Sequence, residues 1–419
     1  MKNLLATLDR KSLSLVRQVG ELAQEKKVGA YLVGGPVRDL LLKRKIADLD
    51  FVIEGDAIKL AVEFSRRHKG QCVQYSAFKT ATVVLLDGVA LDFASTRREI
   101  YASPGALPTV TLSGIADDLF RRDFSINAMA ISVTPATFGV LVDPYDGLKD
   151  IKHKIIRILH PKSFIDDPTR LFRAVRFEAR LKCRMDKETL KCFRDAIAHK
   201  ASNFVKPQRY FEEFKKILKE GDVLKPLARL RQLQALRVAP LELTFNERRA
   251  MFIKEVRRGL QFCKRHAIKG VEAWVVYLMS ILEEEKPDDL SFVLGQLGFS
   301  NVDNKKLVLS LSFPKVLGKL SSAYLKPSWA YVFLKPYGLD ELVFFRSRAD
   351  ELARRRIDRY LSHDRHVRLA IDGDDLKRLG IPSGARMKYI LQEVLSLLID
   401  GKIKTKEQQL KCARQLGGE

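Results

Sequence analysis

Strand-forming sequence is confined to about the first 150 residues of this chain, and that restricts the folds it can adopt. Short runs rich in β-branched and aromatic residues alternate there with helical segments such as 57–68; the runs lie at 31–33, 50–53, 82–86 and 89–93. The pair Asp87-Gly88 separates the last two runs and predicts a hairpin, so part of the sheet is expected to be antiparallel. The pattern argues against a doubly wound parallel sheet.

Amphipathic stretches with a helical period follow from about Asp150 onward, at 168–181, 187–199, 207–219 and 246–265 among others. Breaks rich in Pro and Gly near 221–222, 313–314 and 335–338 divide them. A chain of 419 residues also exceeds what one hydrophobic core usually serves. We therefore expect an α+β protein with a mixed-sheet head at 1–150, a helical neck at 151–221, a helical body at 222–335 and a helical tail at 336–419.

Positive charge predominates, with 75 Lys and Arg against 51 Asp and Glu and a formal net charge of +24. Such a field attracts polyanions and makes nucleic acid the first partner to consider, although net charge alone also fits a generally solvated basic surface. The five cysteines form no C-x-x-C pair, which argues against a zinc module or a disulfide framework and favours the reducing cytoplasm.

The chain shows no sign of a membrane segment, because no apolar run is long enough to span a bilayer. The stretch 1–27 is amphipathic and contains acidic residues, so it is expected to be a helix and not a signal sequence. We expect no membrane association, and nothing in the sequence indicates an obligate protein partner.

A strand that runs into two glycines and a proline is the first motif that suggests chemistry. In Leu32-Val-Gly34-Gly35-Pro36-Val-Arg38, the proline suits the first turn of a helix. Free backbone amides at Gly34 and Gly35, together with Arg38, could bind a triphosphate. Taken alone, a Gly-Gly turn is more often only a tight loop.

Two aspartates follow, Asp48 and Asp50, whose period-two spacing predicts that both carboxylates point from one face of one strand. Apolar neighbours favour a half-buried strand, where an unpaired carboxylate is costly unless a cation lies beside it. Magnesium suits such a pair, and Asp92, in the next apolar run, is expected to be a third carboxylate. Two-metal phosphoryl transfer follows as the natural chemistry, in which no nucleophilic side chain is required; no G-x-S-x-G motif appears.

The order of these motifs resembles the class II tRNA nucleotidyltransferases, the family of CCA-adding enzymes, their A-adding and CC-adding specialists, and bacterial poly(A) polymerases. Further segments resemble the family in the expected order; they lie at 97–101, 104–110, 118–128, 166–177 and 203–218. The resemblance implies a polymerase-β-like nucleotidyltransferase head and catalysis with two Mg²⁺ ions held by Asp48 and Asp50. One departure stands at Gln208, where the family usually has Glu.

The resemblance also implies roles for the residues that bind the incoming nucleotide. Arg122 would contact phosphate and Asp123 the ribose 2′-hydroxyl, with Asn127 in the same segment. Asp167 and Arg170 would read the base edge, followed on the same helical face by Arg173 and Arg176. Three arginines on one face are costly unless an anion lies opposite them.

Donor and acceptor counting explains how an aspartate and an arginine could select a base. Cytosine and adenine each present an amino donor beside a ring-nitrogen acceptor, which a carboxylate and a guanidinium satisfy. Uracil and guanine reverse that order and would leave charged groups unpaired, at roughly 1–3 kcal/mol each.

The resemblance thus predicts CCA addition to the tRNA 3′ end from CTP and ATP, with the tail at 371–402 resembling the segment that would hold tRNA away from the active site. Three alternatives within the family remain: A addition only, CC addition only, and poly(A) synthesis. The loop Ser103 to Val110 resembles A-adding relatives, which keeps that alternative open. A non-catalytic RNA-binding protein on a decayed scaffold is a more distant one.

Overall fold

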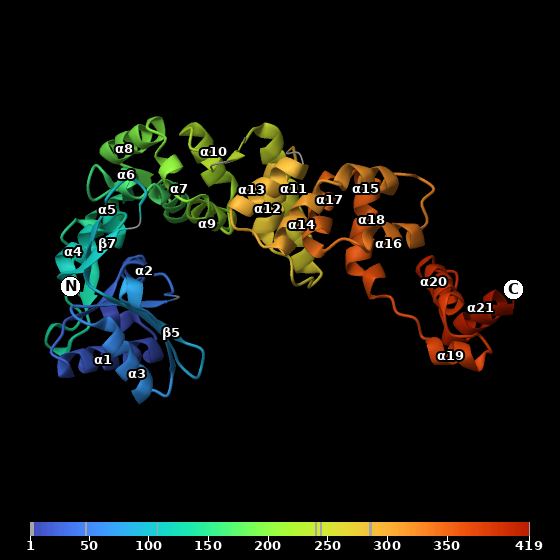
Figure 1. Cartoon of the computed structure of the whole chain (residues 1–419), viewed down its shortest axis with the longest axis horizontal. Coiled ribbons are helices and arrows are strands. Elements are labelled where there is room, and N and C mark those ends of the chain that lie inside the picture. The colour runs from blue at the N-terminus through green and yellow to red at the C-terminus, as the bar shows by residue number, and fades with distance from the viewer. Residues whose placement is uncertain are drawn as a thin grey trace. The chain divides into compact units, whose positions relative to one another are not determined.

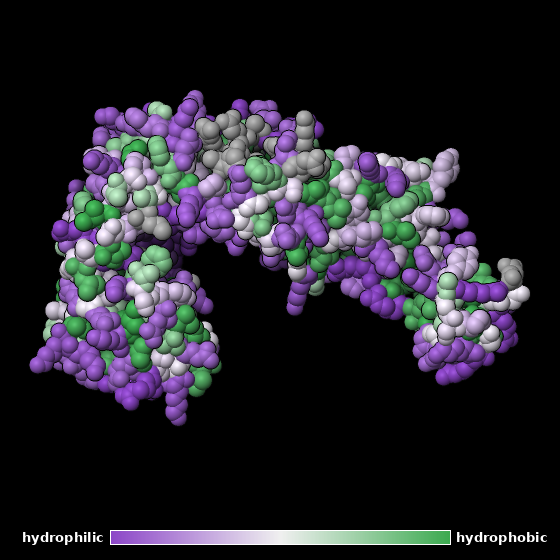
Figure 2. All heavy atoms as spheres, viewed as in Figure 1, coloured by the Kyte–Doolittle hydropathy of each residue, from purple (hydrophilic) through white to green (hydrophobic). Residues whose placement is uncertain are grey.

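The computed structural model describes residues 4–46, 48–106, 108–238, 241–243, 245–284 and 287–418. The chain forms two compact units, Met1–Ala239 and Pro240–Glu419 (Figure 1). The expected head and neck both fall in the first unit, and the finer division into four modules stays a prediction. Hydrophilic residues cover most of the visible face of the first unit, as the charge of the chain predicts (Figure 2).

A mixed sheet of seven strands forms the centre of the head, in the order β3-β4-β5-β2-β1-β8-β9. Only the β2–β5 pair is parallel among these neighbours. The hairpin predicted at Asp87-Gly88 is confirmed as the antiparallel β4–β5 connection. The strands are β1 (Ala30–Val33), β2 (Leu49–Ile53), β3 (Gln71–Tyr75), β4 (Thr80–Val84), β5 (Ala90–Ser95), β8 (Ala130–Ser132) and β9 (Leu141–Val142).

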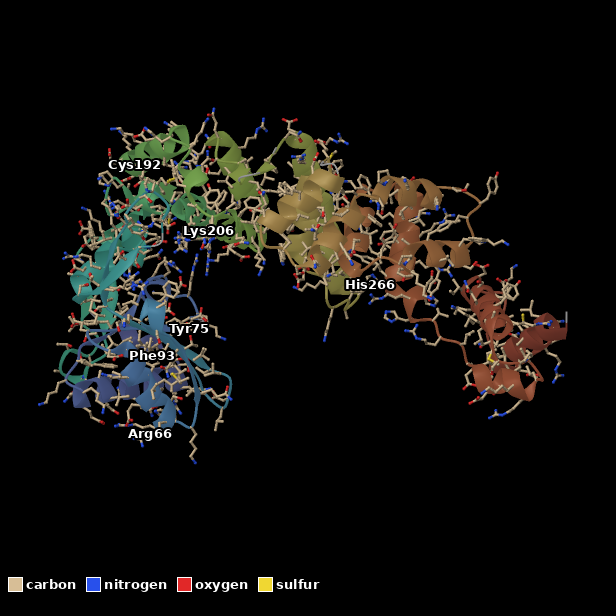
Figure 3. All side chains as sticks on the ribbon, in the orientation of Figure 1. Arg66, Tyr75, Phe93, Cys192, Lys206 and His266 are labelled. Carbon is tan, nitrogen blue, oxygen red and sulfur yellow. The ribbon has the colours of Figure 1, made fainter. Side chains whose placement is uncertain are left out.

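Helices α1 and α3 cover one face of this sheet (Figure 1). Phe93 of β5 lies in that core, with its ring 5.5 Å from Phe51 and 5.9 Å from Phe64 (Figure 3). Since strand side chains alternate between faces, Asp50 and Asp92 point to the opposite face, where Val33 and Val52 pack with α4. The head helices are α1 (Arg10–Glu25), α2 (Gly35–Leu41), α3 (Ala57–Arg67), α4 (Ile115–Phe120) and α5 (Gly147–His153).

The helix expected over 1–27 is shorter than predicted. A 3-10 turn at Leu4–Thr7 precedes α1, which begins after Asp9, because the Asp9 carboxylate accepts hydrogen bonds from the amides of Lys11 and Ser12. Residues 1–3 lie outside the described residues. Two strands that the sequence reasoning did not predict, β6 (Arg97–Ile100) and β7 (Thr109–Leu112), form a separate antiparallel hairpin.

The rest of the first unit is helical, with three two-residue strands. Helix α7 begins at Thr169, one residue later than expected, and the Asp167 carboxylate still accepts from the Thr169 amide at its start. The elements are β10 (Ile155–Ile156), α6 (Ser163–Asp166), α7 (Thr169–Leu181), β11 (Arg184–Met185), α8 (Lys187–Ala198), α9 (Pro207–Leu218), α10 (Leu224–Gln232) and β12 (Arg237–Val238).

In the described residues of the second unit, β13 (Leu241–Glu242) is the one strand, and the other regular elements are helices. Helix α12 is buried around nearly its whole circumference, and the tail helices α19 to α21 share a small core of their own. None of the helices in the described ranges is long and apolar enough to cross a membrane. The helices are α11 (Glu247–Arg265), α12 (Ala273–Leu282), α13 (Pro287–Gln296), α14 (Asn301–Ser310), α15 (Phe313–Leu320), α16 (Pro327–Leu334), α17 (Leu339–Arg348), α18 (Glu351–Ser362), α19 (Gly373–Arg378), α20 (Ala385–Ile399) and α21 (Lys406–Gly418).

Candidate active site

A cavity of about 1050 Å³ in the first unit brings the predicted residues together. It is lined by the turn after β1, the start of β2, the β6–β7 hairpin, the segment around 121–127, and helices α7 and α9. Every candidate except Asp92 lines it: Gly34, Gly35, Arg38, Asp48, Asp50, Arg122, Asp123, Asn127, Asp167, Arg170, Arg173 and Arg176.

The carboxylates of the first motif differ in their surroundings. Asp48 precedes β2 and is exposed, so only Asp50 lies within the strand, contrary to the prediction that both stand on it. Asp92 is the direct cross-strand partner of Asp50, but it accepts a hydrogen bond from Thr82 Oγ1 and is not among the described residues that line the cavity. Burial, then the charges of Asp92 and Asp48, raise the pKa of Asp50 to about 6.

These carboxylates fit a magnesium site by their chemistry. Among the described residues, no three His, Cys, Asp or Glu side chains are gathered as a ready-made metal site. Magnesium, however, keeps most of its water and substrate ligands and needs only one or two protein carboxylates. A cation between Asp48 and Asp50 would offset the burial and the carboxylate repulsion that together raise the Asp50 pKa. The residues present therefore suit the ion that the sequence predicted.

Gly34 occupies a backbone conformation that requires glycine, with φ at +70°. A Cβ atom there would lie 2.7 Å from Nη1 of Arg122, so the turn and the arginine are in close contact. Arg122 donates from Nη2 to Asp118 Oδ2 at 3.0 Å, whereas its buried Nε has no hydrogen-bond partner among the described residues. Arg122 thus presents unused donor capacity beside the glycine turn.

Arg38 is already engaged by neighbouring side chains. Its Nε and Nη2 donate to the two carboxylate oxygens of Asp39, and Nη1 donates to Asn127 Oδ1 at 2.7 Å. Its guanidinium also lies 5.2 Å from the ring centroid of Phe177. The structure therefore places Arg38 at the cavity wall, where it fixes Asn127.

Asp123 is buried among donors at the cavity wall. Oδ2 accepts from Arg173 Nε at 2.8 Å and Nη2 at 2.5 Å, and Oδ1 accepts from Asn127 Nδ2 and the Phe124 amide. Burial opposes ionisation, but Arg173 and Asn127 prevail and hold the pKa of Asp123 below its usual value. This carboxylate joins the head to α7.

The two residues expected to read the base are joined through the backbone, where the Arg170 amide donates to the Asp167 carbonyl at 3.0 Å, but their side chains have different partners. Asp167 pairs with Arg209 of α9 at 3.0 Å and accepts from the Thr169 hydroxyl at 2.6 Å. Arg170 donates from Nη1 to Ser163 Oγ and from Nη2 to the Arg121 carbonyl. Both side chains line the cavity, and Arg209 is a third member of the group that sequence reasoning missed.

Acidic side chains lie opposite the arginines of α7. The sequence analysis expected an anion there, because three arginines on one helical face repel one another. Arg173 faces Glu213 at 3.5 Å besides Asp123, and Arg176 faces Glu213 at 4.0 Å and Glu220 at 3.5 Å. The protein itself thus supplies anions for this face. Gln208, where the family usually has Glu, is exposed near the start of α9.

The β6–β7 hairpin forms one wall of the cavity. The sequence analysis found family resemblance in this hairpin but did not predict that it belongs to the site. Arg97 and Arg121 both donate to Glu99 Oε1, and Tyr101 Oη donates to Oε2 at 2.9 Å. Gly105, in the connecting loop, has φ at +68°, and a Cβ atom there would lie 2.6 Å from the carbonyl oxygen of Phe204. Leu107 lies outside the described residues.

Comparisons with known proteins agree with this arrangement. Residues 30–157 match the poly(A) polymerase head domain. The A-adding tRNA nucleotidyltransferase of Halalkalibacterium halodurans is 33% identical over 413 residues, covering 98% of this chain and 93% of the relative. That of Geobacter sulfurreducens is 33% identical over 418 residues, covering 98% of this chain but 47% of the relative, so the chain spans about half of that protein.

Solved structures give the same result. A CCA-adding enzyme in an apo form has a TM-score of 0.81 and 30% identity, covering 98% of this chain and 97% of that one. The Thermotoga maritima CCA-adding enzyme complexed with tRNA has a TM-score of 0.77 and 29% identity, with 98% and 97% covered. Since the match to the Halalkalibacterium relative extends over almost the whole of both chains, this chain belongs to the class II tRNA nucleotidyltransferase and poly(A) polymerase family.

Proposed function

We propose that this chain adds a single A from ATP to tRNA that already ends in CC. The observation that carries the proposal is the 33% identity to an A-adding enzyme over 98% of this chain and 93% of that relative. The cavity supports it with two carboxylates at β2, arginines beside a glycine turn, and an Asp–Arg group for a base edge. The free cysteines suit the reducing cytoplasm, where we propose that the reaction takes place.

In the proposed reaction the terminal 3′-hydroxyl oxygen of the tRNA attacks the α-phosphorus of ATP. An oxygen–phosphorus bond forms, the bond between the α- and β-phosphates breaks, pyrophosphate leaves, and the hydroxyl proton passes to solvent. Two magnesium ions, bound by Asp48 and Asp50, would neutralise the triphosphate and lower the pKa of the hydroxyl. Arg122, whose Nη1 lies beside the Gly34 turn, would bind the phosphates.

Base selection would depend on Asp167 together with Arg170 and Arg209. The Asp167 carboxylate, held by Thr169 and Arg209, retains lone pairs for the amino group of adenine. A guanidinium beside it can donate to the adjacent ring nitrogen. Guanine and uracil would place a carbonyl against Asp167 and an N–H against the arginine. Asp123 would select ribose, although its oxygens are also used to hold Arg173 and Asn127.

Complete CCA addition is the second candidate. It is favoured by the likeness to CCA-adding enzymes over nearly the whole chain, at a TM-score of 0.81. The same donor pair accepts cytosine as well as adenine, so the base-reading group alone does not separate the two activities.

The test is incorporation of labelled CTP and ATP, separately and together, onto tRNA transcripts that end at the discriminator base, at C, and at CC. One A on the CC-ended transcript alone supports the proposal. Growth of all three transcripts to CCA supports the second candidate instead, and a long A tail would indicate poly(A) synthesis. The Asp48→Ala, Asp50→Ala double variant is the control: an enzyme loses incorporation and keeps tRNA binding, whereas a binding protein has no incorporation to lose.

A further inference from the structure

One segment of the second unit combines lysines and aromatic residues without any acidic residue. Between Asp303 and Asp340 the sequence contains no Asp or Glu. It carries six lysines and six aromatic residues, at 305, 306, 315, 319, 326 and 335 and at 313, 324, 329, 331, 333 and 337 respectively. The segment comprises most of α14, then α15, α16 and the loop between them, and α15 and α16 lie against α18 (Figure 1). Such interleaving is typical of surfaces that bind single-stranded nucleic acid.

Three of these aromatic side chains are exposed or half-buried. The side chain of Tyr324 is 96% exposed and that of Trp329 is 55% exposed, whereas large aromatic residues are usually much more buried. Phe333 lies one helical turn after Trp329, with the ring centroids 6.1 Å apart, and Lys319 Nζ lies 4.7 Å from the Phe333 ring. We call Tyr324, Trp329 and Phe333, with Lys319 and Lys326, the aromatic platform.

The backbone that carries these rings is held firmly. Arg356 of α18 donates from its guanidinium to the carbonyls of Leu320, Ser322 and Leu325, at 2.5, 2.7 and 2.9 Å. At the start of α16, the amide and hydroxyl of Ser328 donate to the two carboxylate oxygens of Asp400, at 2.8 and 3.0 Å. The exposed rings therefore stand on fixed backbone, so little conformational entropy is lost when a ligand stacks on them.

Two of the acidic groups near this segment accept hydrogen bonds from the protein. Asp400 accepts from Ser328, and Asp350, which precedes α18, accepts from the Ala353 amide. Lys306 is paired with Asp340 at 3.6 Å. The other five lysines of the segment have no Asp or Glu of the same segment to pair with. This excess of positive charge favours a polyanion as the partner over a protein surface that carries charges of both signs.

We propose that the aromatic platform stacks unpaired bases of the RNA substrate while Lys319 and Lys326 contact the adjacent phosphates. The identity of that RNA as tRNA rests on the proposed function; the stacking chemistry rests on the platform itself. Every base has a π-face, so the platform would tolerate many sequences and would discriminate unpaired from paired nucleotides.

Tryptophan fluorescence tests the platform directly in the full-length chain. The chain has two tryptophans; the other, Trp274, is 9% exposed and donates to Glu272. In a Trp274→Phe variant, emission reports on Trp329 alone. Titration with a tRNA transcript ending in CC is expected to quench that emission in a saturable manner. A fully paired RNA duplex of similar length at the same salt concentration is expected to quench it far less. Equal quenching by the duplex would overturn the proposal, as would no quenching by tRNA.

Binding variants give the second measurement. Tyr324→Ala and Trp329→Ala are each expected to weaken tRNA binding about tenfold, the scale of one base–aromatic stack. Trp329→Phe should retain most of the affinity because it keeps a ring. Phe292→Ala, which removes another exposed ring (69%) in α13, is the matched control and should change nothing. Equal affinity of the Tyr324→Ala and wild-type chains would overturn the proposal.

Two controls separate this inference from its rivals. If Trp329 emission changes on dilution without RNA, the platform is an interface between copies of the chain and the proposal is wrong. Incorporation of A is measured in parallel. Quenching without incorporation supports the aromatic platform and contradicts the proposed function. Incorporation without quenching supports the proposed function and overturns the aromatic platform.

Discussion

Asp123 and Arg173 form a part-buried two-point ion pair, in which Oδ2 of the buried head residue accepts from both Nε and Nη2 of the half-buried α7 residue, at 2.8 and 2.5 Å. Neither side chain is more than 28% exposed. The pair joins the segment that would hold the ribose to the helix that would hold the base. Its removal therefore tests the link between the head and the neck.

Arg173→Met is expected to destabilise the chain by about 3–5 kcal/mol, because it leaves the Asp123 carboxylate buried without its cation. Adding Asp123→Asn should restore part of that loss. Urea unfolding followed by circular dichroism measures both. Arg67→Met breaks surface pairs with Glu25 and Glu63 and should leave the midpoint nearly unchanged. Additive losses in the Asp123/Arg173 double variant would contradict the prediction.

Gly34→Ala should weaken ATP binding as well as stability. A Cβ atom at positive φ costs about 1–2 kcal/mol, and here it would also displace Arg122. Gly88→Ala is the matched control, since Gly88 has φ at +84° and a Cβ atom added there would meet no other atom within 4 Å. Calorimetric titration with ATP should show weaker binding for Gly34→Ala only; equal ATP affinity in the two variants would show that Arg122 had not moved.

Asp48→Asn and Asp50→Asn should each reduce A incorporation more than about a hundredfold, since metal ions contribute several kcal/mol of charge stabilisation. Asp92→Asn should reduce it less, because Asp92 accepts from Thr82 and does not line the cavity. Initial rates across a magnesium titration, with tRNA affinity measured separately, make the comparison. An equal loss at all three positions would instead support Asp92 as a metal ligand.

Asp167→Asn should relax base selection. An amide presents both a donor and an acceptor, so discrimination of ATP from GTP is expected to fall about tenfold or more, in keeping with roughly 1–3 kcal/mol for an unpaired charged group. The ratio of kcat/KM values for the two nucleotides is the measurement. Glu212→Gln changes an exposed side chain at the same cavity and should leave the ratio unaltered.

His160 should make the chain less stable as the pH falls. Burial, then the charge of Arg170, lower the pKa of His160 below its usual value. The unfolded chain therefore binds more protons than the folded chain around and below about pH 6.5, so this contribution to stability is lost as the pH falls through that value. Urea midpoints from about pH 8 to pH 5 should decline more steeply for the wild type than for His160→Phe. Parallel curves would refute this assignment.

Sequence reasoning succeeded where a local pattern carries the information. The β-rich run at 50–53 identified β2, which contains Asp50, and the Asp87-Gly88 turn identified the β4–β5 hairpin that brings Asp92 beside it. The helices predicted at 187–199 and 207–219 were also placed closely: α8 begins at Lys187 and α9 at Pro207, as expected. In each case residues within a few positions of each other determine the structure.

Partners supplied by distant elements could not be predicted in that way. Nothing in the sequence around Asp167 indicates that Arg209 of another helix pairs with it, or that Glu213 faces Arg173. The β6–β7 hairpin was missed because Arg97-Arg98-Glu99 is charged throughout and lacks an alternating apolar face. Its charges are satisfied only by the folded surroundings, in which Glu99 accepts from Arg121.

The pairing of Asp123 with Arg173 has a consequence for how the first unit can be divided. A fragment that ended at residue 157, where the poly(A) polymerase head match stops, would retain the buried carboxylate but lose its cation. It would also lose the ring of Phe177, which packs edge-on to Phe124 at 5.9 Å. The boundary of the sequence match is therefore not a boundary of folding: sheet and neck helices should melt in one cooperative transition, and a truncation there would yield a fragment that cannot hold its own nucleotide site together.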